Sequence, residues 1–399
     1  MRKISANYVF PISGEPIKNG IVCLNSDNVI VDVINPGDSF REVQNLERYS
    51  GIITPGFVNA HCHLELSHLK GILSKETGMA GFISEIGQFR NSFSFEDIQK
   101  SINWADNLMK SRGIVAVGDI VNSTDTISIK KTSSLFYHSF VELFGQNPQM
   151  ANDIISNGVK INQSFSDAGL VSSIVPHAPY SVSPELFQQI GKTVSSDTVF
   201  SIHIKESYQE EQLFKDKKGE LFSFCKAMYN NVESNIGTTT DSLDYISQFL
   251  SSNINLLLVH AVFLTSKKLK ELFNKYNKNN IFVVLCPLSN KFIGNNISNL
   301  EDLLSVTSNI CIGTDSLASN TDLSILAEII ELSHNFPEVS LQQLLSFATI
   351  NGARALNIDS SFGSIDKGKK PGLNLIQGVN LLNFNLSASS KVISLIKSY

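Results

Sequence analysis

A short apolar run leads directly into two histidines in the stretch Ile52-Ile53-Thr54-Pro55-Gly56-Phe57-Val58-Asn59-Ala60-His61-Cys62-His63. Mostly apolar runs of this length are typical of strands that are buried on both faces, as in parallel sheets. Side chains at positions i and i+2 of an extended strand project to the same side, so His61 and His63 can reach one cation. This stretch therefore predicts a buried strand with chemistry at its carboxyl end.

Seven further apolar runs follow, and longer segments with helical patterning separate them. One such segment, residues 95–111, has two acidic residues in its first turn, and another, residues 323–333, is apolar on one helix face. The strand-like runs are residues 52–58, 114–120, 135–143, 170–175, 199–204, 256–263, 281–286 and 310–312. Strands that alternate with helices in this way predict an α/β fold, a closed parallel (β/α)₈ TIM-type barrel.

The two ends of the chain have a different pattern. Residues 20–34 contain two short β-type runs joined by a turn-prone Asn-Ser-Asp-Asn sequence, which predicts an antiparallel hairpin. Residues 362–365 and 372–376 are again β-like. We therefore expect a small β-sandwich formed by the N- and C-terminal segments, residues 1–54 and 355–399, beside a barrel of residues 55–354.

The composition excludes several classes of protein. Hydrophobic residues make up 42% and charged residues 17%, as in a globular chain rather than a disordered one. The formal net charge of −5 provides no basic field for nucleic acid or an anionic membrane. We find no secretory signal and no apolar stretch near the ~20 residues that span a bilayer. The five scattered cysteines indicate buried hydrophobes in a reducing compartment.

These properties predict a cytoplasmic protein whose partner is a small-molecule substrate. We expect no nucleic-acid partner and no membrane partner, and a homodimer is compatible with the sequence.

Residues with metal-ligand or proton-transfer chemistry gather where the apolar runs end. A single His at such a place is more often a hydrogen-bonded core residue, and an Asp is often a helix N-cap. Here four of the eight histidines of the chain fall at the ends of three runs. Because strand ends meet at one face of a barrel, the coincidence predicts a metal centre. Its candidate residues are His61, His63, His203, Glu206, His260 and Asp315.

Together these motifs resemble those of the amidohydrolase superfamily, within its mononuclear deaminase branch. That branch includes cytosine, guanine and S-adenosylhomocysteine deaminases and the related chlorohydrolases. The resemblance extends over nearly the whole chain. It departs in one place, because Leu285 stands where a His often precedes the Cys of the motif CPLSN at 286–290. The motifs are PGFVNAHCH at 55–63, HIKE at 203–206, PHAPYS at 176–181, CPLSN at 286–290, GTD at 313–315, GARAL at 352–356 and GSIDKG at 363–368.

The resemblance implies one divalent metal ion, held by His61, His63, His203 and Asp315. Zn²⁺ suits three nitrogens and a carboxylate, and Fe²⁺ would accept the same set. Two-metal members of the superfamily bridge their ions with a carboxylated lysine at the end of strand four. Residues 171–177 contain no lysine, so we expect a single ion.

The resemblance also implies the catalytic roles. A bound divalent ion lowers the pKa of water to about 7, which makes hydroxide available for attack on the amino-bearing carbon. His260 and Asp315 would take the proton of that water. Glu206 would protonate the neighbouring ring nitrogen and then pass a proton to the departing ammonia.

The substrate contacts are less well determined. His177 and Ser319 match positions that touch purine or sugar in the resembling deaminases, and a purely structural hydrogen bond is an equal alternative for each. Glu65 and His68 could bind ribose hydroxyls or support the site from behind.

The sequence HCHLELSHLKG at residues 61–71, together with PHAPYSVS, resembles that of the aminofutalosine deaminase-type subgroup, which acts in menaquinone synthesis. We therefore expect a hydrolytic deaminase of an adenine-containing nucleoside of the aminodeoxyfutalosine, methylthioadenosine or S-adenosylhomocysteine type. A chlorohydrolase or another hydrolase of cyclic C–N bonds is the nearest alternative, and a non-catalytic scaffold is a remote one.

Overall fold

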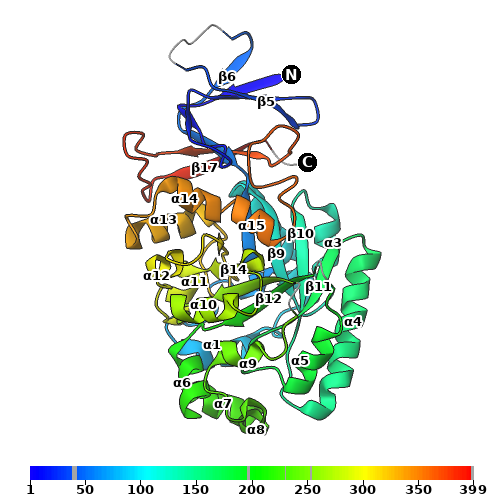
Figure 1. Cartoon of the computed structure of the whole chain (residues 1–399). Coiled ribbons are helices and arrows are strands. Elements are labelled where there is room, and N and C mark those ends of the chain that lie inside the picture. Colours follow the sequence, from blue (N-terminus) through cyan, green and yellow to red (C-terminus); the bar gives the residue numbers. More distant parts are fainter. Residues whose placement is uncertain (38–42, 196–197, 230, 252–253, 397–399) are drawn as a thin grey trace.

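The computed structural model of the chain describes residues 1–37, 43–195, 198–229, 231–251 and 254–396. Residues 38–42 and 397–399, which belong to the expected small domain, lie outside the described residues. The N-terminus and strand β17 (Lys391–Ile396) lie at the end of the molecule that carries the small sheets, and helices α6 (Tyr208–Asp216) to α8 (Val232–Ile236) lie at the opposite end (Figure 1).

The central strands run parallel and form two four-stranded sheets within the described residues, ordered β11-β10-β9-β8 and β12-β13-β14-β15. Their outer strands also meet, because β11 contacts β12 and β15 contacts β8. The strands are β8 (Phe57–Cys62), β9 (Ile114–Val121), β10 (Phe136–Leu143), β11 (Val171–Pro176), β12 (Val199–Ile204), β13 (Asn255–His260), β14 (Ile281–Leu285) and β15 (Ile310–Ile312). The fold is thus α/β with parallel sheets, as the sequence predicts.

Both faces of these strands are buried, which explains why their sequences are apolar without alternation. Every residue of β9 and β12 is buried. Side chains from the two sheets, such as Phe140 of β10 and Val259 of β13, meet in one apolar cluster. The two sheets therefore share an interior.

The first apolar run is divided in two by Gly56. Residues 52–55 form β7 (Ile52–Pro55) of a small sheet, and β8 begins the parallel sheet at Phe57. A Cβ at Gly56 would lie 2.2 Å from a methyl group of Val115 and 2.8 Å from the Pro371 carbonyl oxygen. Only glycine fits at this position, where the chain leaves the small sheet and enters the parallel sheet.

The helices follow the strands. α2 (Phe95–Ser111) has the predicted bounds, and the Ser94 side chain caps it by accepting a hydrogen bond from the Asp97 N–H. α13 (Ile325–Asn335) begins two residues later than predicted, because Ser324 caps it. The others include α1 (Gly78–Phe89), α3 (Ile127–Thr132), α4 (Ala151–Asp167), α5 (Pro184–Gly191), α6 (Tyr208–Asp216), α7 (Glu220–Met228), α8 (Val232–Ile236), α9 (Ser242–Ile246), α10 (Ser266–Phe273), α11 (Pro287–Ile293), α12 (Leu300–Leu304), α14 (Leu341–Phe347) and α15 (Ile350–Ala355).

The ends of the chain form two small sheets among the described residues, ordered β5-β4-β1-β6 and β17-β16-β7-β2-β3. Ile4 and Val22 of the first sheet share a buried cluster with Ile53 and Leu375 of the second. The strands are β1 (Arg2–Ser5), β2 (Tyr8–Val9), β3 (Ile17–Lys18), β4 (Ile21–Leu24), β5 (Ile30–Ile34), β6 (Leu46–Arg48), β16 (Leu373–Gln377) and β17 (Lys391–Ile396).

The hairpin expected in residues 20–34 is confirmed, since β4 and β5 pair antiparallel. The β-like reading of residues 362–365 is wrong, because they form turns and bends. Gly363 has a φ of 84°, which interrupts an extended backbone, and the Ile365 N–H donates to the Pro11 carbonyl instead of a ladder partner.

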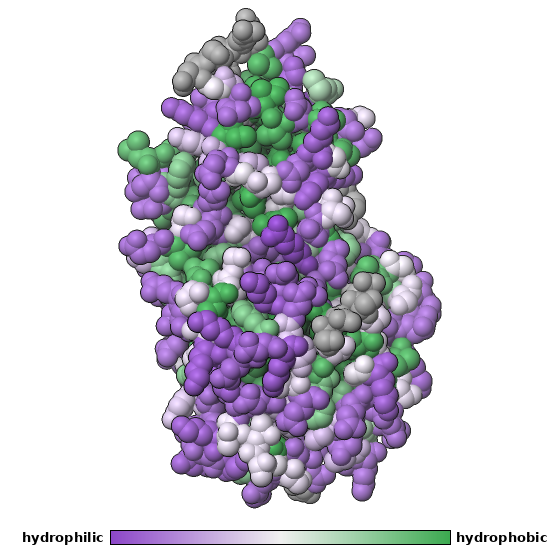
Figure 2. Space-filling view, viewed as in Figure 1, coloured by the Kyte–Doolittle hydropathy of each residue, from purple (hydrophilic) through white to green (hydrophobic). Residues whose placement is uncertain are grey.

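The face of the molecule in Figure 2 is largely hydrophilic over the helices, while hydrophobic residues gather around the small sheets at the top. No helix in the described part of the chain is both long and apolar enough to cross a membrane.

Candidate active site

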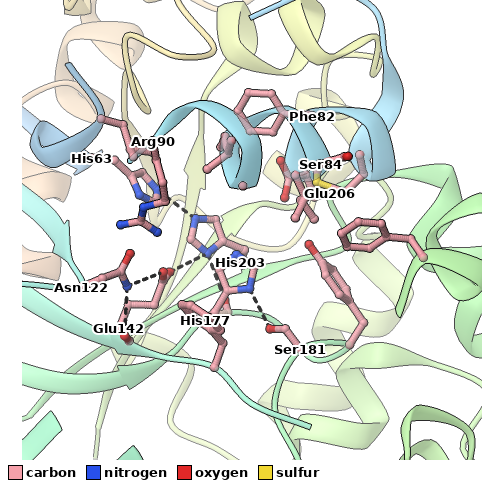
Figure 3. Close-up of a pocket in the computed structure, with 18 of the residues that line it drawn as sticks. His63, Phe82, Ser84, Arg90, Asn122, Glu142, His177, Ser181, His203 and Glu206 are labelled. Carbon is pink, nitrogen blue, oxygen red and sulfur yellow. Dashed lines mark hydrogen bonds and ion pairs between the residues drawn. The ribbon is translucent and has the colours of Figure 1, made fainter. Parts of the chain in front are cut away.

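A cavity of about 580 Å³ opens at the carboxyl ends of the parallel strands. Helices α1 and α7 contact each other and contribute to its wall. Its polar side is formed by residues at strand ends and on α1, which Figure 3 shows converging. The apolar part of the wall consists of Leu66, Met79, Phe82, Ile83, Ile86, Phe144, Phe224 and Met228. The cavity can therefore accept a ligand with one polar and one apolar part.

Three imidazoles converge at the polar side. The Nε2 atom of His63 lies 3.1 Å from that of His61 and 3.2 Å from that of His203, and His61 and His203 are 3.2 Å apart. The Oδ1 atom of Asp315 lies 3.4 Å from His63 Nε2 and 3.7 Å from His61 Nε2. All four predicted metal ligands are thus brought together by β8, β12 and the end of β15.

This arrangement fits a tetrahedral metal ion. Bonds of about 2.0–2.1 Å from a central Zn²⁺ place neighbouring ligand atoms roughly 3.3–3.4 Å apart. The three His–His distances and the distances from Asp315 to His61 and His63 scatter around that value. Burial lowers the pKa of both His61 and His203, which keeps the imidazoles in the neutral form that binds a metal. The Nδ1–H of His203 donates to the His177 carbonyl at 3.0 Å, so its Nε2 lone pair faces the cluster.

The Asp315 carboxylate is held by two hydroxyl groups. Its Oδ2 atom accepts hydrogen bonds from Ser289 at 2.6 Å and from Ser319 at 2.8 Å. Burial alone would raise the pKa of Asp315, but the facing His63, His260 and His61 outweigh it and hold the pKa below its usual range. Asp315 is therefore ionised, with Oδ1 directed at the histidines.

The backbone also brings these ligands together. The Asn59 side chain donates to the Thr314 hydroxyl at 2.7 Å and accepts from the Thr314 N–H at 3.0 Å, which joins β8 to the segment after β15. A Cβ at Gly313 would lie 2.8 Å from the His61 carbonyl oxygen, so a larger residue would separate His61 from Asp315. His260 and Asp315 have φ values of 68° and 56°, the strained left-handed conformation that clusters at functional sites.

Glu206 and His260, which the sequence predicts to transfer protons, lie next to each other. Glu206 Oε1 lies 3.4 Å from His260 Nε2, and both residues line the cavity. Burial, followed by the charges of Asp315 and Glu210, raises the pKa of Glu206 well above its usual range. His260 donates from Nδ1 to the Asn290 side-chain oxygen at 2.8 Å, and burial lowers its pKa. These shifts favour the protonated carboxyl of Glu206 and the neutral imidazole of His260.

His177 lies in the cavity wall directly after β11. Its Nδ1 atom is 2.7 Å from the Ser181 hydroxyl, which in turn donates to the Ala178 carbonyl at 3.1 Å. Burial lowers the pKa of His177 to about 4, so the ring is neutral. Its Nε2 atom is consequently an acceptor that a ligand can use.

Ser319 and Glu65 do not line the cavity, unlike the substrate contacts expected from the sequence. The Ser319 hydroxyl is fully buried and bonded to Asp315. The Glu65 carboxylate accepts from the N–H groups of Asn122 and Ser123 and from the Ser123 hydroxyl. Both ring nitrogens of His68 face backbone carbonyls. These side chains support the site from behind.

The polar residues of the cavity wall that sequence reasoning missed include Arg90, Asn122 and Glu142. Glu142 is buried near the end of β10, and the Asn122 side chain donates to its Oε2 atom at 3.2 Å. Burial raises the pKa of Glu142, partly opposed by the charge of His63. One signal was available, because Glu142 is a charged residue just before the carboxyl end of its strand, where the candidate metal-ligand histidines also lie in their strands.

Known proteins with related sequences are deaminases. An adenosine deaminase of Helicobacter pylori is 28% identical over 334 residues, which cover 82% of this chain and 79% of that protein. A 5-methylthioadenosine/S-adenosylhomocysteine deaminase of Moorella thermoacetica is 23% identical over 383 residues, covering 92% and 83% respectively.

Two solved structures have the same fold over nearly their whole length. Aminofutalosine deaminase of Helicobacter pylori in complex with methylthio-coformycin has a TM-score of 0.79 and 25% identity, with 95% of this chain and 93% of that chain covered. The zinc complex of atrazine chlorohydrolase from Arthrobacter aurescens has a TM-score of 0.75 and 16% identity, covering 98% and 93%. The amidohydrolase family pattern matches residues 52–398. The chain, with its converging histidines and aspartate, therefore belongs to the amidohydrolase family of hydrolytic enzymes.

Proposed function

We propose that the protein is a mononuclear metal-dependent deaminase of an adenine-containing nucleoside. The observation that carries the proposal is the convergence of three imidazole nitrogens, 3.1–3.2 Å apart, with an Asp315 oxygen 3.4 Å from His63 and 3.7 Å from His61, in a cavity that also contains the buried carboxyl of Glu206. A metal site next to a protonated acid suits hydrolysis at a ring carbon whose neighbouring nitrogen needs a proton.

His61, His63, His203 and Asp315 would hold one Zn²⁺ or Fe²⁺ ion, because β11 offers no lysine to bridge a second. Elemental analysis should find close to one transition-metal ion per chain, and His61→Ala should lose most of it. Two tightly bound ions, both needed for turnover, would contradict the single-metal assignment.

When bound, the ion supplies hydroxide near neutral pH by lowering the pKa of water to about 7. The residues of the chain carry out the proton transfers. His260 Nε2 can accept a proton because Nδ1 donates to Asn290. His260 and Asp315 would share the proton that the attacking water gives up. The Glu206 carboxyl would donate its proton to the ring nitrogen beside the attacked carbon and would then relay the remaining proton of the attacking oxygen to the departing amine. The proton held by His260 and Asp315 would restore the Glu206 carboxyl. Water is consumed and ammonia is released.

The relatives named above support an adenosine-type substrate, and the cavity agrees with it. His177 presents a neutral acceptor and donor ring to a purine. The apolar part of the wall, from α1 and α7, would take a substituent on the sugar. We therefore propose aminodeoxyfutalosine, methylthioadenosine or S-adenosylhomocysteine as the substrate type.

We also infer that the strands β8 to β15 of the described residues close into one (β/α)₈ barrel. The contacts between β11 and β12 and between β15 and β8, together with the shared interior, support this closure. The cluster shared by the two small sheets supports a β-sandwich of residues 1–54 and 355–399, with the barrel in residues 55–354.

The test is a panel of amines assayed for ammonia release and for loss of the adenine absorbance. We expect the 5′-substituted adenosines to give kcat/KM above roughly 10⁴ M⁻¹s⁻¹, and free cytosine and guanine to be at least about tenfold poorer. Equal or better activity on free guanine, cytosine or a chlorinated triazine would overturn the nucleoside proposal and leave the metal site standing.

A further inference from the structure

Glu142 has a carboxylate oxygen that the protein leaves unsatisfied. Its side chain is 5% exposed and lines the cavity. The Oε2 atom accepts a hydrogen bond from Asn122, but Oε1 has no hydrogen-bond partner among the described residues. His203 Nδ1 lies 3.4 Å from Oε1, yet its single N–H is already donated to the His177 carbonyl at 3.0 Å. Because burying such an oxygen unpaired costs free energy, it marks a place for a ligand's donor.

Arg90 offers the complementary group. It stands at the carboxyl end of α1, lines the same cavity, and points toward Asn122 and Glu142 (Figure 3). Within the described residues its guanidinium forms no ion pair and no hydrogen bond with a side chain. A carboxylate and a guanidinium therefore face one part of the cavity without forming an ion pair with each other.

We propose that Glu142 and Arg90 bind the two neighbouring hydroxyl groups of the substrate's ribose; this inference rests on the nucleoside substrate proposed above. A hydroxyl group both donates and accepts, so a vicinal diol can donate to Glu142 and accept from Arg90 at once. The two side chains carry opposite charges that balance. A phosphate in this place would be repelled by Glu142, and an ammonium group would be repelled by Arg90.

The position of the pair agrees with this role. Glu206, which would protonate the base, and Glu142 lie on opposite sides of His203 in Figure 3. The ring of His177, with its centroid 5.0 Å from that of His203, also lies in this wall. A nucleoside whose base contacts Glu206 can thus extend past the imidazoles and present its sugar to Glu142.

The experiment is a thermodynamic cycle between side chain and hydroxyl. The metal-loaded enzyme and its variants are assayed on a substrate nucleoside and on its 2′-deoxy and 3′-deoxy analogues. We expect the wild type to prefer the ribose form by about 10- to 100-fold in kcat/KM, the range for hydrogen bonds to charged groups. Glu142→Gln and Arg90→Met should remove most of that preference, chiefly through KM. Arg112→Met, the same change at an exposed arginine outside the cavity, should keep it.

A binding measurement separates recognition from turnover. Calorimetry with coformycin and 2′-deoxycoformycin should show the same loss of preference in Glu142→Gln. If this variant does not fold, Arg90→Met and Arg90→Lys carry the test.

Each contrary result has one meaning. If the wild type deaminates ribose and deoxyribose forms equally, the diol site is wrong and the nucleoside proposal stands. If Glu142→Gln weakens both forms equally, Glu142 only supports His203, and the inference falls. If no nucleoside releases ammonia at all, the proposed function itself fails.

Discussion

Two buried carboxylates on neighbouring strands, Asp119 of β9 and Glu142 of β10, have opposite surroundings. Asp119 Oδ2 lies 2.6 Å from the Lys130 ammonium, both side chains are fully buried, and Oδ1 accepts the Leu64 N–H at 2.7 Å. Lys130 also donates to the Ser139 hydroxyl at 2.8 Å. Glu142, by contrast, lines the cavity and has one buried oxygen without a hydrogen-bond partner, and Arg90 forms no ion pair in the described part of the chain.

The difference separates two uses of a buried charge. A closed ion pair stabilises the backbone around it, and here it fixes the N–H of the residue after His63. An open carboxylate stabilises nothing in the protein alone, so its use must come from a ligand or from catalysis. Substitutions in the closed group should thus change stability, and those in the open group should change activity.

Glu206, which like Glu142 faces the cavity, should give the largest effect on activity. Glu206→Gln keeps the shape but removes the titratable proton, so kcat should fall by about 10²–10⁴ while metal content persists. Stability should stay the same within about 0.5 kcal/mol, because a neutral amide replaces a largely protonated acid. Steady-state kinetics, elemental analysis and urea unfolding measure the three quantities. Near-normal turnover would show that the ring-protonation role is wrong.

Lys130→Met tests the closed pair. It leaves Asp119 buried without its cation, and the free energy of unfolding should fall by about 3–5 kcal/mol. Arg90→Met removes a cation that has no ion-pair partner in the described chain, and should change stability by less than about 0.5 kcal/mol. Urea unfolding of both variants makes the comparison. Equal losses in the two would remove the distinction between closed and open charges.

Ser319→Ala should give a smaller effect, because Asp315 keeps its hydrogen bond from Ser289. Loss of one hydrogen bond to a charged acceptor costs about 1.5–3 kcal/mol, and we expect it to appear as weaker metal retention in competition with a chelator. Ser128→Ala, which removes an exposed hydroxyl outside the cavity wall, is the matched control. A change in KM for nucleosides with metal affinity intact would restore Ser319 as a substrate contact.

The smallest expected effect is a shift of the pH profile. Burial, and then the charges of Asp315 and Glu210, raise the pKa of Glu206, which favours its protonated form, and the proton is lost as the pH rises through that pKa. Stability from the buried neutral carboxyl is lost in the same direction. Glu210→Gln removes one negative charge, so the alkaline limb of kcat/KM should move to lower pH. An unmoved limb would show that another group sets it.

Local sequence signals predicted the strands well, and the residues expected to bind the metal lie close together, although their role stays a prediction. Continuous apolar runs mark strands buried on both faces, and α2 was found to the residue because Ser94 and two acidic residues mark its start. The roles of Glu65 and Ser319 were not predictable, since their partners lie on other segments. Residues 362–365 look like a strand, but the Phe362 N–H bonds locally to the Ile358 carbonyl and the Ile365 N–H bonds to the Pro11 carbonyl, far away in the sequence.

The cavity wall has a polar part at the strand ends and an apolar part on helices, and this division affects how such an enzyme can evolve. The imidazoles stand on strands, whereas the apolar residues Phe82 and Met228 stand on helices α1 and α7, inserted after different strands. Mutations on these helices can reshape the space beside the metal without moving any ligand atom. Reaction chemistry and substrate range are therefore inherited on separate segments, and a lineage can explore new nucleosides while its hydrolytic step is preserved.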